Sequence, residues 1–296
     1  FNRLRLDREP VLRLIVTGKC NLACEFCVYR VSPFFSPEVS NGQLVDLAPS
    51  HELETMLRFM RDRLGYSAIH LTGGEPTLSS HVNRIAQLAR NLGLRVHIGT
   101  NLVNIKVIAA MAENDLVDEV TFTYVPQDAD KERRKEVASG FQTVDERRSA
   151  ATMDNVRSLR KFCPRITIKS NIVISALTSI DAATSFVQWC WEKGVIPRMQ
   201  RDRSSGRIVG SNGAVLSVLS LLSMKPQEVL FRIPGATEVC SFADDKGREL
   251  HVKVFNQNFR LASVCERCPR SPACDKALSA IRVFASSTNG PRIAFC

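Results

Sequence analysis

Short apolar segments alternate with segments of helical period along about the first two hundred residues of the chain. Leu12–Thr17 is short, apolar and β-branched, which is typical of a buried strand. Residues 51–64 carry apolar side chains at helical spacing, with Ser50 placed as the N-cap. The same alternation predicts further strands at 68–71, 94–98, 119–124, 165–174 and 195–199, and further helices at 79–91, 105–113, 152–162 and 180–193.

This alternation of strands and helices predicts an α/β fold with a parallel sheet and right-handed crossovers. Because six units are two short of a full eight-fold barrel, we expect a partial (β/α)6 TIM-like barrel over residues 1–200. The pattern changes after residue 201, where helices are expected at 214–222 and 226–231 and a turn at 244–247. We therefore assign residues 201–296 to a small C-terminal domain.

Composition narrows the class of protein without naming a substrate. The chain has 296 residues, 44% of them apolar, and it contains no apolar run long enough to span a membrane. Phe1–Pro10 is charged and lacks the apolar core of a signal peptide, so we expect a cytoplasmic protein. The net charge of +10 permits an anionic substrate, but no RNA-binding motif accompanies the scattered basic residues, so nucleic acid is not an expected partner.

Seven of the ten cysteines fall into two groups, which favours metal binding over disulfides. Cys20, Cys24 and Cys27 follow the first strand and match three corners of a 4Fe-4S cluster, which leaves one iron open to a small molecule. The second group lies near the end of the sequence, where four thiolates could fill a second cluster or a zinc site. Its members are Cys265, Cys268, Cys274 and Cys296.

The Cys-x3-Cys-x2-Cys loop, with Phe26 before its last cysteine, resembles the motif of the radical S-adenosylmethionine (radical SAM) superfamily. Gly73-Gly74-Glu75-Pro76 at the end of the next strand resembles that family's methionine-binding turn. The resemblance implies that SAM chelates the open iron and that an external donor, a flavodoxin or ferredoxin, supplies one electron. It further implies that SAM is cleaved to a 5′-deoxyadenosyl radical, which abstracts hydrogen from a small-molecule substrate.

The same resemblance implies roles for residues at three strand ends. Gly73, Gly74 and Glu75 would meet the methionine part of SAM, glycine allowing close backbone approach. Thr100 and Asn101 would lie near SAM, and Ser170 and Asn171 near its ribose. Each of these two pairs could instead cap a strand end.

The second cysteine group resembles the auxiliary-cluster segment of the molybdenum-cofactor cyclase and of other radical SAM enzymes with a twitch or SPASM-like domain. Cys274 departs from that spacing as an added thiol. Residues 281–284 and 291–295 are expected to form two strands joined by a turn, which would return Cys296 toward Cys265 and Cys268. The resemblance implies that residues 201–296 form a small C-terminal iron–sulfur cluster-binding domain and that the cofactors are two 4Fe-4S clusters and SAM.

Cys240 lies in a loop-like stretch between the barrel and the second cysteine group, where it could donate hydrogen to a substrate radical, ligate the second cluster or be an inert core thiol. The first role favours an epimerase similar to the neomycin type, acting on a secondary-metabolite sugar such as an aminoglycoside. A chain with a net positive charge is expected to repel that polycation, unless acidic residues line the binding site. Alternatives are a nucleotide cyclase like the molybdenum-cofactor enzyme, a dehydrogenase using the auxiliary cluster as electron acceptor, or a non-catalytic iron–sulfur scaffold.

Overall fold

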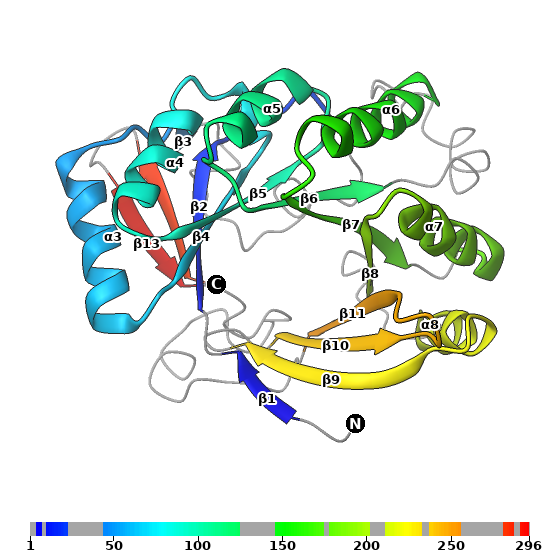
Figure 1. Cartoon of the computed structure of the whole chain (residues 1–296). Helices are drawn as coiled ribbons and strands as arrows, with labels where there is room; N and C mark the ends of the chain where they lie inside the picture. The colour runs from blue at the N-terminus through cyan, green and yellow to red at the C-terminus, as the bar shows by residue number, and fades with distance from the viewer. Residues whose placement is uncertain are drawn as a thin grey trace, which may run out of the picture.

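A curved, mostly parallel sheet forms the centre of the molecule, and helices cover its convex side (Figure 1). The computed structural model describes residues 4–7, 10–22, 44–124, 146–174, 178–201, 211–232, 237–255, 281–286 and 291–295. Its central strands are β2 (Val11–Thr17), β4 (Ala68–Gly73), β5 (Arg95–Thr100), β6 (Glu119–Tyr124), β7 (Thr167–Ile174) and β8 (Ile196–Arg201). Each is paired in parallel with the next, which confirms the predicted α/β fold and is consistent with a partial barrel.

The later part of the chain extends this sheet at both edges. Beyond β8 the order continues through β11 to β10, β9 and β1, and beyond β2 it continues to β12 and β13. β12 is parallel to β2 and antiparallel to β13 and β3, so the two strands predicted near the end of the sequence are confirmed, while the turn predicted between them lies outside the described residues. These edge strands are β1 (Leu4–Asp7), β3 (Leu44–Val45), β9 (Lys225–Arg232), β10 (Thr237–Ala243), β11 (Glu249–Phe255), β12 (Ile281–Ser286) and β13 (Pro291–Phe295).

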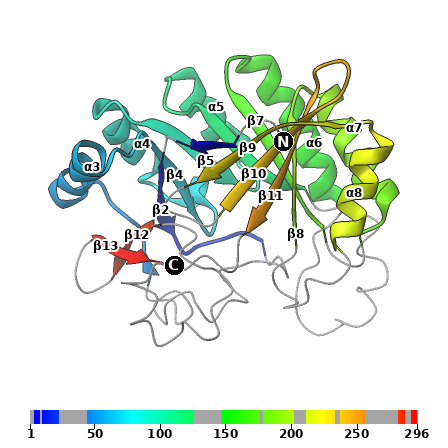
Figure 2. The same cartoon turned by 90° about the horizontal axis from the view of Figure 1, so that it is seen from below.

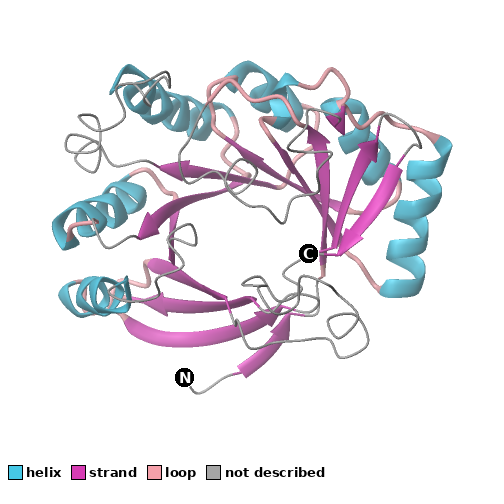
Figure 3. Ribbon diagram, turned by 180° about the vertical axis from the view of Figure 1, so that it is seen from behind, coloured by secondary structure: helices cyan, strands magenta, loops and turns pink. Residues whose placement is uncertain are grey.

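Helices pack on the outer side of the strands, with α3 and α8 at opposite ends of the sheet (Figures 2 and 3). α3 begins as expected, because the Ser50 hydroxyl accepts a hydrogen bond from Leu53 N at 3.2 Å. It ends at Gly65, whose φ of 70° is a left-handed conformation that favours glycine. The helices are α3 (His51–Leu64), a 3-10 turn η1 (Pro76–Leu78), α4 (Val82–Asn91), α5 (Ile105–Glu113), α6 (Glu146–Phe162), α7 (Ile180–Glu192) and α8 (Ser211–Leu221).

The two faces of each strand differ in chemistry. Along β7, buried and half-buried positions alternate strictly, and buried Ile168 and Ile172 join the core packed against the helices. Lys169 and Asn171 occupy the half-buried positions between them and face the concave side. Apolar burial beneath the helices therefore fixes which side chains line the inside of the curved sheet.

Two expectations for the later part of the chain are wrong. Residues 226–231, expected to be helical, belong to strand β9, and the supposed loop around Cys240 belongs to strand β10. A short apolar run does not distinguish strand from helix, and here pairing of β9 with both β1 and β10 decides the outcome. Within the described residues, no helix is both long and apolar enough to cross a membrane.

Candidate functional site at the carboxyl ends and concave face of the sheet

The carboxyl ends of β2, β4 and β5 meet at one edge, where the predicted motifs lie together. Gly74 N donates to Thr17 O at 2.8 Å, and Glu75 N donates to Lys19 O at 2.7 Å. A Cβ on Gly73 would lie 2.3 Å from Thr17 O, and one on Gly74 would lie 2.1 Å from Lys19 O. The backbone that approaches these glycines is therefore the segment leading into the cysteine loop.

The Glu75 carboxylate holds this edge together. It is 1% exposed, and Oε1 accepts hydrogen bonds from Thr77 N at 3.1 Å, Thr77 Oγ1 at 2.7 Å and Thr100 Oγ1 at 2.7 Å. Oε2 accepts from Asn101 N at 2.7 Å. Both oxygens thus bind donors of the protein itself, so Glu75 ties the end of β4 to the end of β5.

Asn101 extends the connection to the cysteine loop. Its side-chain amide donates to Asn21 Oδ1 at 2.7 Å, and its Oδ1 accepts from Val103 N at 3.0 Å. Next to Asn21, the exposed Cys20 thiol accepts a hydrogen bond from Leu22 N at 3.4 Å. The structure therefore brings Cys20, Glu75 and Asn101 into one connected edge.

The residues at this edge fit a cluster-binding loop. Cys20 presents an exposed sulfur, the ligand type that iron–sulfur clusters require, directly beside the Gly-Gly-Glu turn. Cys24, Cys27 and Phe26 lie outside the residues that the structure describes, as do the four cysteines of the second group. Their roles stay predictions.

Ser170 and Asn171 point to opposite faces of β7. Ser170 is fully buried and lies beside the Cys190 thiol, whose pKa is raised by burial. Asn171 is half-buried on the concave face. Of the two residues expected near the ribose of SAM, Ser170 faces the helical layer, and only Asn171 faces the inside of the sheet.

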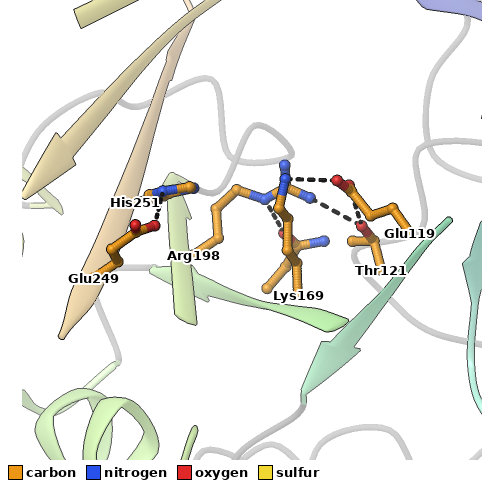
Figure 4. A network of polar contacts seen from close by, with 7 residues as sticks. Glu119, Thr121, Lys169, Arg198, Glu249 and His251 are labelled. Atoms are coloured by element: carbon orange, nitrogen blue, oxygen red, sulfur yellow. Dashed lines mark hydrogen bonds and ion pairs between the residues drawn. The ribbon is translucent and has the colours of Figure 1, made fainter. Parts of the chain in front are cut away.

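A charged network, which the sequence patterns did not single out, lies on the concave face (Figure 4). Lys169 Nζ forms an ion pair with Glu119 Oε2 at 2.6 Å, with both side chains about 15% exposed. Arg198 Nε donates to Asn171 Oδ1 at 2.6 Å, and Nη2 lies 3.5 Å from Thr121 Oγ1. These side chains come from β6, β7 and β8 and point toward one another.

A row of polar side chains continues the network across the sheet. Arg13, His70, His97 and Glu119 are successive partners on β2, β4, β5 and β6. Burial, with Arg13 and His97 nearby, lowers the pKa of His70 well below its ordinary value, so its imidazole is neutral. Arg282 of β12 pairs with Arg13 at the other end of the row.

Glu119 is the acidic member of this row. Burial would raise its pKa, but the charges of Lys169 and His97, together with the Lys169 hydrogen bond, outweigh burial and lower the pKa to about 2. At the edge of the network, His251 of β11 pairs with Glu249 at 3.2 Å. Polar residues at every second position of otherwise apolar strands were the available sequence signal for this surface.

Cys240 does not face this network. It pairs with Val252 of β11, and cross-strand partners share a face. Val252 and Phe242 on that face pack against the hydrophobic core, whereas His251 lies on the other face as the partner of Arg198. Burial raises the pKa of the Cys240 thiol. Its side chain is therefore directed away from the concave face, and a hydrogen-donor role for Cys240 stays a prediction that this placement does not favour.

Comparisons with known proteins place these features in a family. The family described as the Radical SAM superfamily matches residues 14–174. A curated relative, the GTP 3′,8-cyclase of Mycobacterium marinum, is 27% identical over 227 residues, covering 73% of this chain and 58% of the relative. The GTP 3′,8-cyclase of Mycolicibacterium smegmatis is 26% identical over 207 residues, covering 65% and 51%. The chain thus spans little more than half the length of these relatives.

A solved structure agrees at the level of fold. The crystal structure of Streptococcus suis SuiB bound to S-adenosylmethionine has a TM-score of 0.51 at 15% identity, covering 72% of this chain and 48% of SuiB. The family match begins within β2, includes the Gly-Gly-Glu turn, β5, β6 and β7, and extends over more than half of the 296 residues. This protein belongs to the radical SAM superfamily.

Proposed function

We propose that this protein is a radical SAM enzyme that binds a nucleoside triphosphate and forms a ring within it. The observation that carries the proposal is the pair of cations, Lys169 and Arg198, that the charged network places on the concave face. A partly buried cation has lost some of its bound water, and phosphate oxygens can take the place of that water as hydrogen-bond acceptors. The curated relatives named GTP 3′,8-cyclase support a ring-forming reaction on a guanine nucleotide.

Family membership makes the protein an enzyme that uses a 4Fe-4S cluster and SAM. When bound, these cofactors supply a 5′-deoxyadenosyl radical that abstracts a substrate hydrogen. Cys20, Cys24 and Cys27 would hold the cluster. The contacts of Glu75 and Asn101 hold the Gly-Gly-Glu turn against the start of that loop.

The strand direction gives the substrate an orientation. Lys169 lies near the start of β7, whereas the cysteine loop begins at the carboxyl end of β2. A triphosphate bound by Lys169 and Arg198 would therefore lie deep in the curved sheet, with its nucleoside directed toward the cysteine edge. Asn171 accepts from Arg198 and orients the guanidinium for this task.

Sugar epimerisation is not supported. The curated relatives are named as cyclases, and Cys240 lies on the outward face. The dehydrogenase reading and the second cluster depend on Cys265, Cys268, Cys274 and Cys296, which lie outside the described residues. Both stay predictions, as does the external electron donor.

Anaerobic turnover of the reconstituted enzyme tests the proposal. GTP, the other nucleoside triphosphates and an aminoglycoside would each be incubated with SAM and dithionite. We expect 5′-deoxyadenosine to accumulate with a nucleotide, together with a product in which NMR detects a new bond between sugar and base. Formation of an epimer from the aminoglycoside, with no change in any nucleotide, would contradict it.

A further inference from the structure

Lys169, the central cation of the concave network, already has a counter-ion. Its Nζ lies 2.6 Å from Glu119 Oε2, and both side chains are about 15% exposed. An ion pair so little exposed is weakly screened by solvent, and so each charge strongly affects what the other can bind. An anion that approaches Lys169 therefore also meets the negative charge of Glu119.

The surroundings keep Glu119 charged. Lys169, His97 and Arg198 all stabilise its carboxylate, and Thr121 Oγ1 lies 3.3 Å from its Oε1. The neighbouring carboxylate, Asp118, directly precedes β6 and has different partners. It forms an ion pair with Arg90 of α4 at 2.7 Å and accepts a hydrogen bond from Val96 N. Asp118 and Glu119 are therefore adjacent in sequence but form ion pairs with different cations.

We propose that Glu119 competes with the anionic part of the substrate for Lys169 and so sets how tightly the phosphates bind. The inference rests on the proposed function, since it takes the phosphates to bind at Lys169. Before the substrate binds, Glu119 holds the flexible lysine stem in place on the concave face. In the complex the charge of Glu119 weakens the binding of phosphate to Lys169.

Calorimetric titration of the reconstituted enzyme with inorganic tripolyphosphate and with GTP tests this competition. Removing the carboxylate charge in Glu119→Gln should tighten both ligands roughly tenfold at low salt, and the gain should shrink as salt is raised. Asp118→Asn is the matched control, because it removes the same charge one residue away on the helical side. It should leave both affinities within about twofold of the wild-type values.

A double-mutant cycle assigns the effect to Lys169. If Glu119 acts through this lysine, the gain should vanish when Glu119→Gln is added to Lys169→Gln. Glu119→Asp keeps the charge but shortens the side chain, so it should raise the affinity for both ligands about threefold. This variant replaces Glu119→Gln in the test if Glu119→Gln does not fold. Unchanged or weaker binding in both Glu119 variants, or a gain that persists without Lys169, would overturn the inference.

The binding measurements distinguish failure of the Glu119 role from failure of the proposed function. A wild-type enzyme that binds neither tripolyphosphate nor GTP overturns the proposed function and this inference together. A wild-type enzyme that binds both, but whose affinity does not respond to Glu119, overturns only the role of Glu119.

Discussion

The cysteine edge and the concave network belong to the same sheet but satisfy their polar groups in different ways. At the edge, the buried Glu75 carboxylate is occupied by four donors from the protein. On the concave face, Lys169 and Glu119 pair with each other at about 15% exposure, and Arg198 beside them is buried. We therefore expect the edge to stay fixed, whereas the proposed function requires Lys169 to exchange Glu119 for a phosphate of the substrate.

This difference predicts that damage to the edge removes cofactor chemistry, whereas damage to the network removes substrate recognition. Gly74→Ala should have the largest effect, because the added Cβ would lie 2.1 Å from Lys19 O. Such a clash between backbone and Cβ forces the cysteine loop to move, at a cost on the order of 3 kcal/mol. We expect reduced iron content on reconstitution and loss of SAM cleavage.

The control for this variant is Gly213→Ala, since nothing lies within 4 Å of a Cβ at that helical position. It should match or slightly exceed wild-type stability, because alanine favours helices. Normal iron content and SAM cleavage in Gly74→Ala would show that the close approach of the two segments is dispensable.

Glu75→Gln keeps the shape of the side chain but turns one oxygen into a donor that faces other donors. We expect about 2–3 kcal/mol of lost stability, because hydrogen bonds to a buried carboxylate are lost and one donor is left unpaired. Chemical denaturation measures the loss, and SAM cleavage should fall with it. A stable variant with normal cleavage would mean that the edge does not depend on this carboxylate.

Lys169→Gln and Arg198→Gln should sharpen the comparison, because both side chains belong to the charged network on β7 and β8. We expect the affinity for GTP to fall by roughly a hundredfold in each, about 2.7 kcal/mol, since a charge-assisted contact to phosphate is lost. Iron content and slow SAM cleavage without substrate should stay at wild-type levels. Loss of cluster assembly in these variants would contradict the separation of the two regions.

The Glu119 pKa of about 2, below the ordinary 4.5, predicts a pH-dependent contribution to stability. Because the folded pKa is the lower one, this contribution is present above about pH 4.5 and is lost as the pH falls toward 2. The difference in thermal stability between wild type and Glu119→Gln should therefore shrink over this range. A difference that is independent of pH would show that the ion pair does not stabilise the fold.

Cys240→Ala should have the smallest effect on turnover, because the thiol lies on the face away from the network. We expect nucleotide conversion within about twofold of wild type, with a modest loss of stability from the removed sulfur atom. Loss of turnover with retained SAM cleavage would support a hydrogen-donor role for Cys240 and an epimerase reaction.

Much of the fold was predictable because it depends on local sequence. Helix α3 was predicted with its observed bounds, since Ser50 and the apolar spacing both act within one segment. The Gly-Gly-Glu turn and Thr100-Asn101 were placed correctly at strand ends for the same reason. By contrast, β9 was mistaken for a helix, because its pairing with β1 and β10 involves segments far away in the sequence.

The sequence by itself determined the radical SAM motifs, the alternation of strands and helices, and the edge on which the motifs meet. Tertiary structure alone decided that Glu119 meets Lys169, which is 50 positions away, and that Ser170 and Cys240 turn from the concave face. The physical reason is that a motif describes neighbours along the chain. A charged network is selected by sheet register and by which face the helices bury.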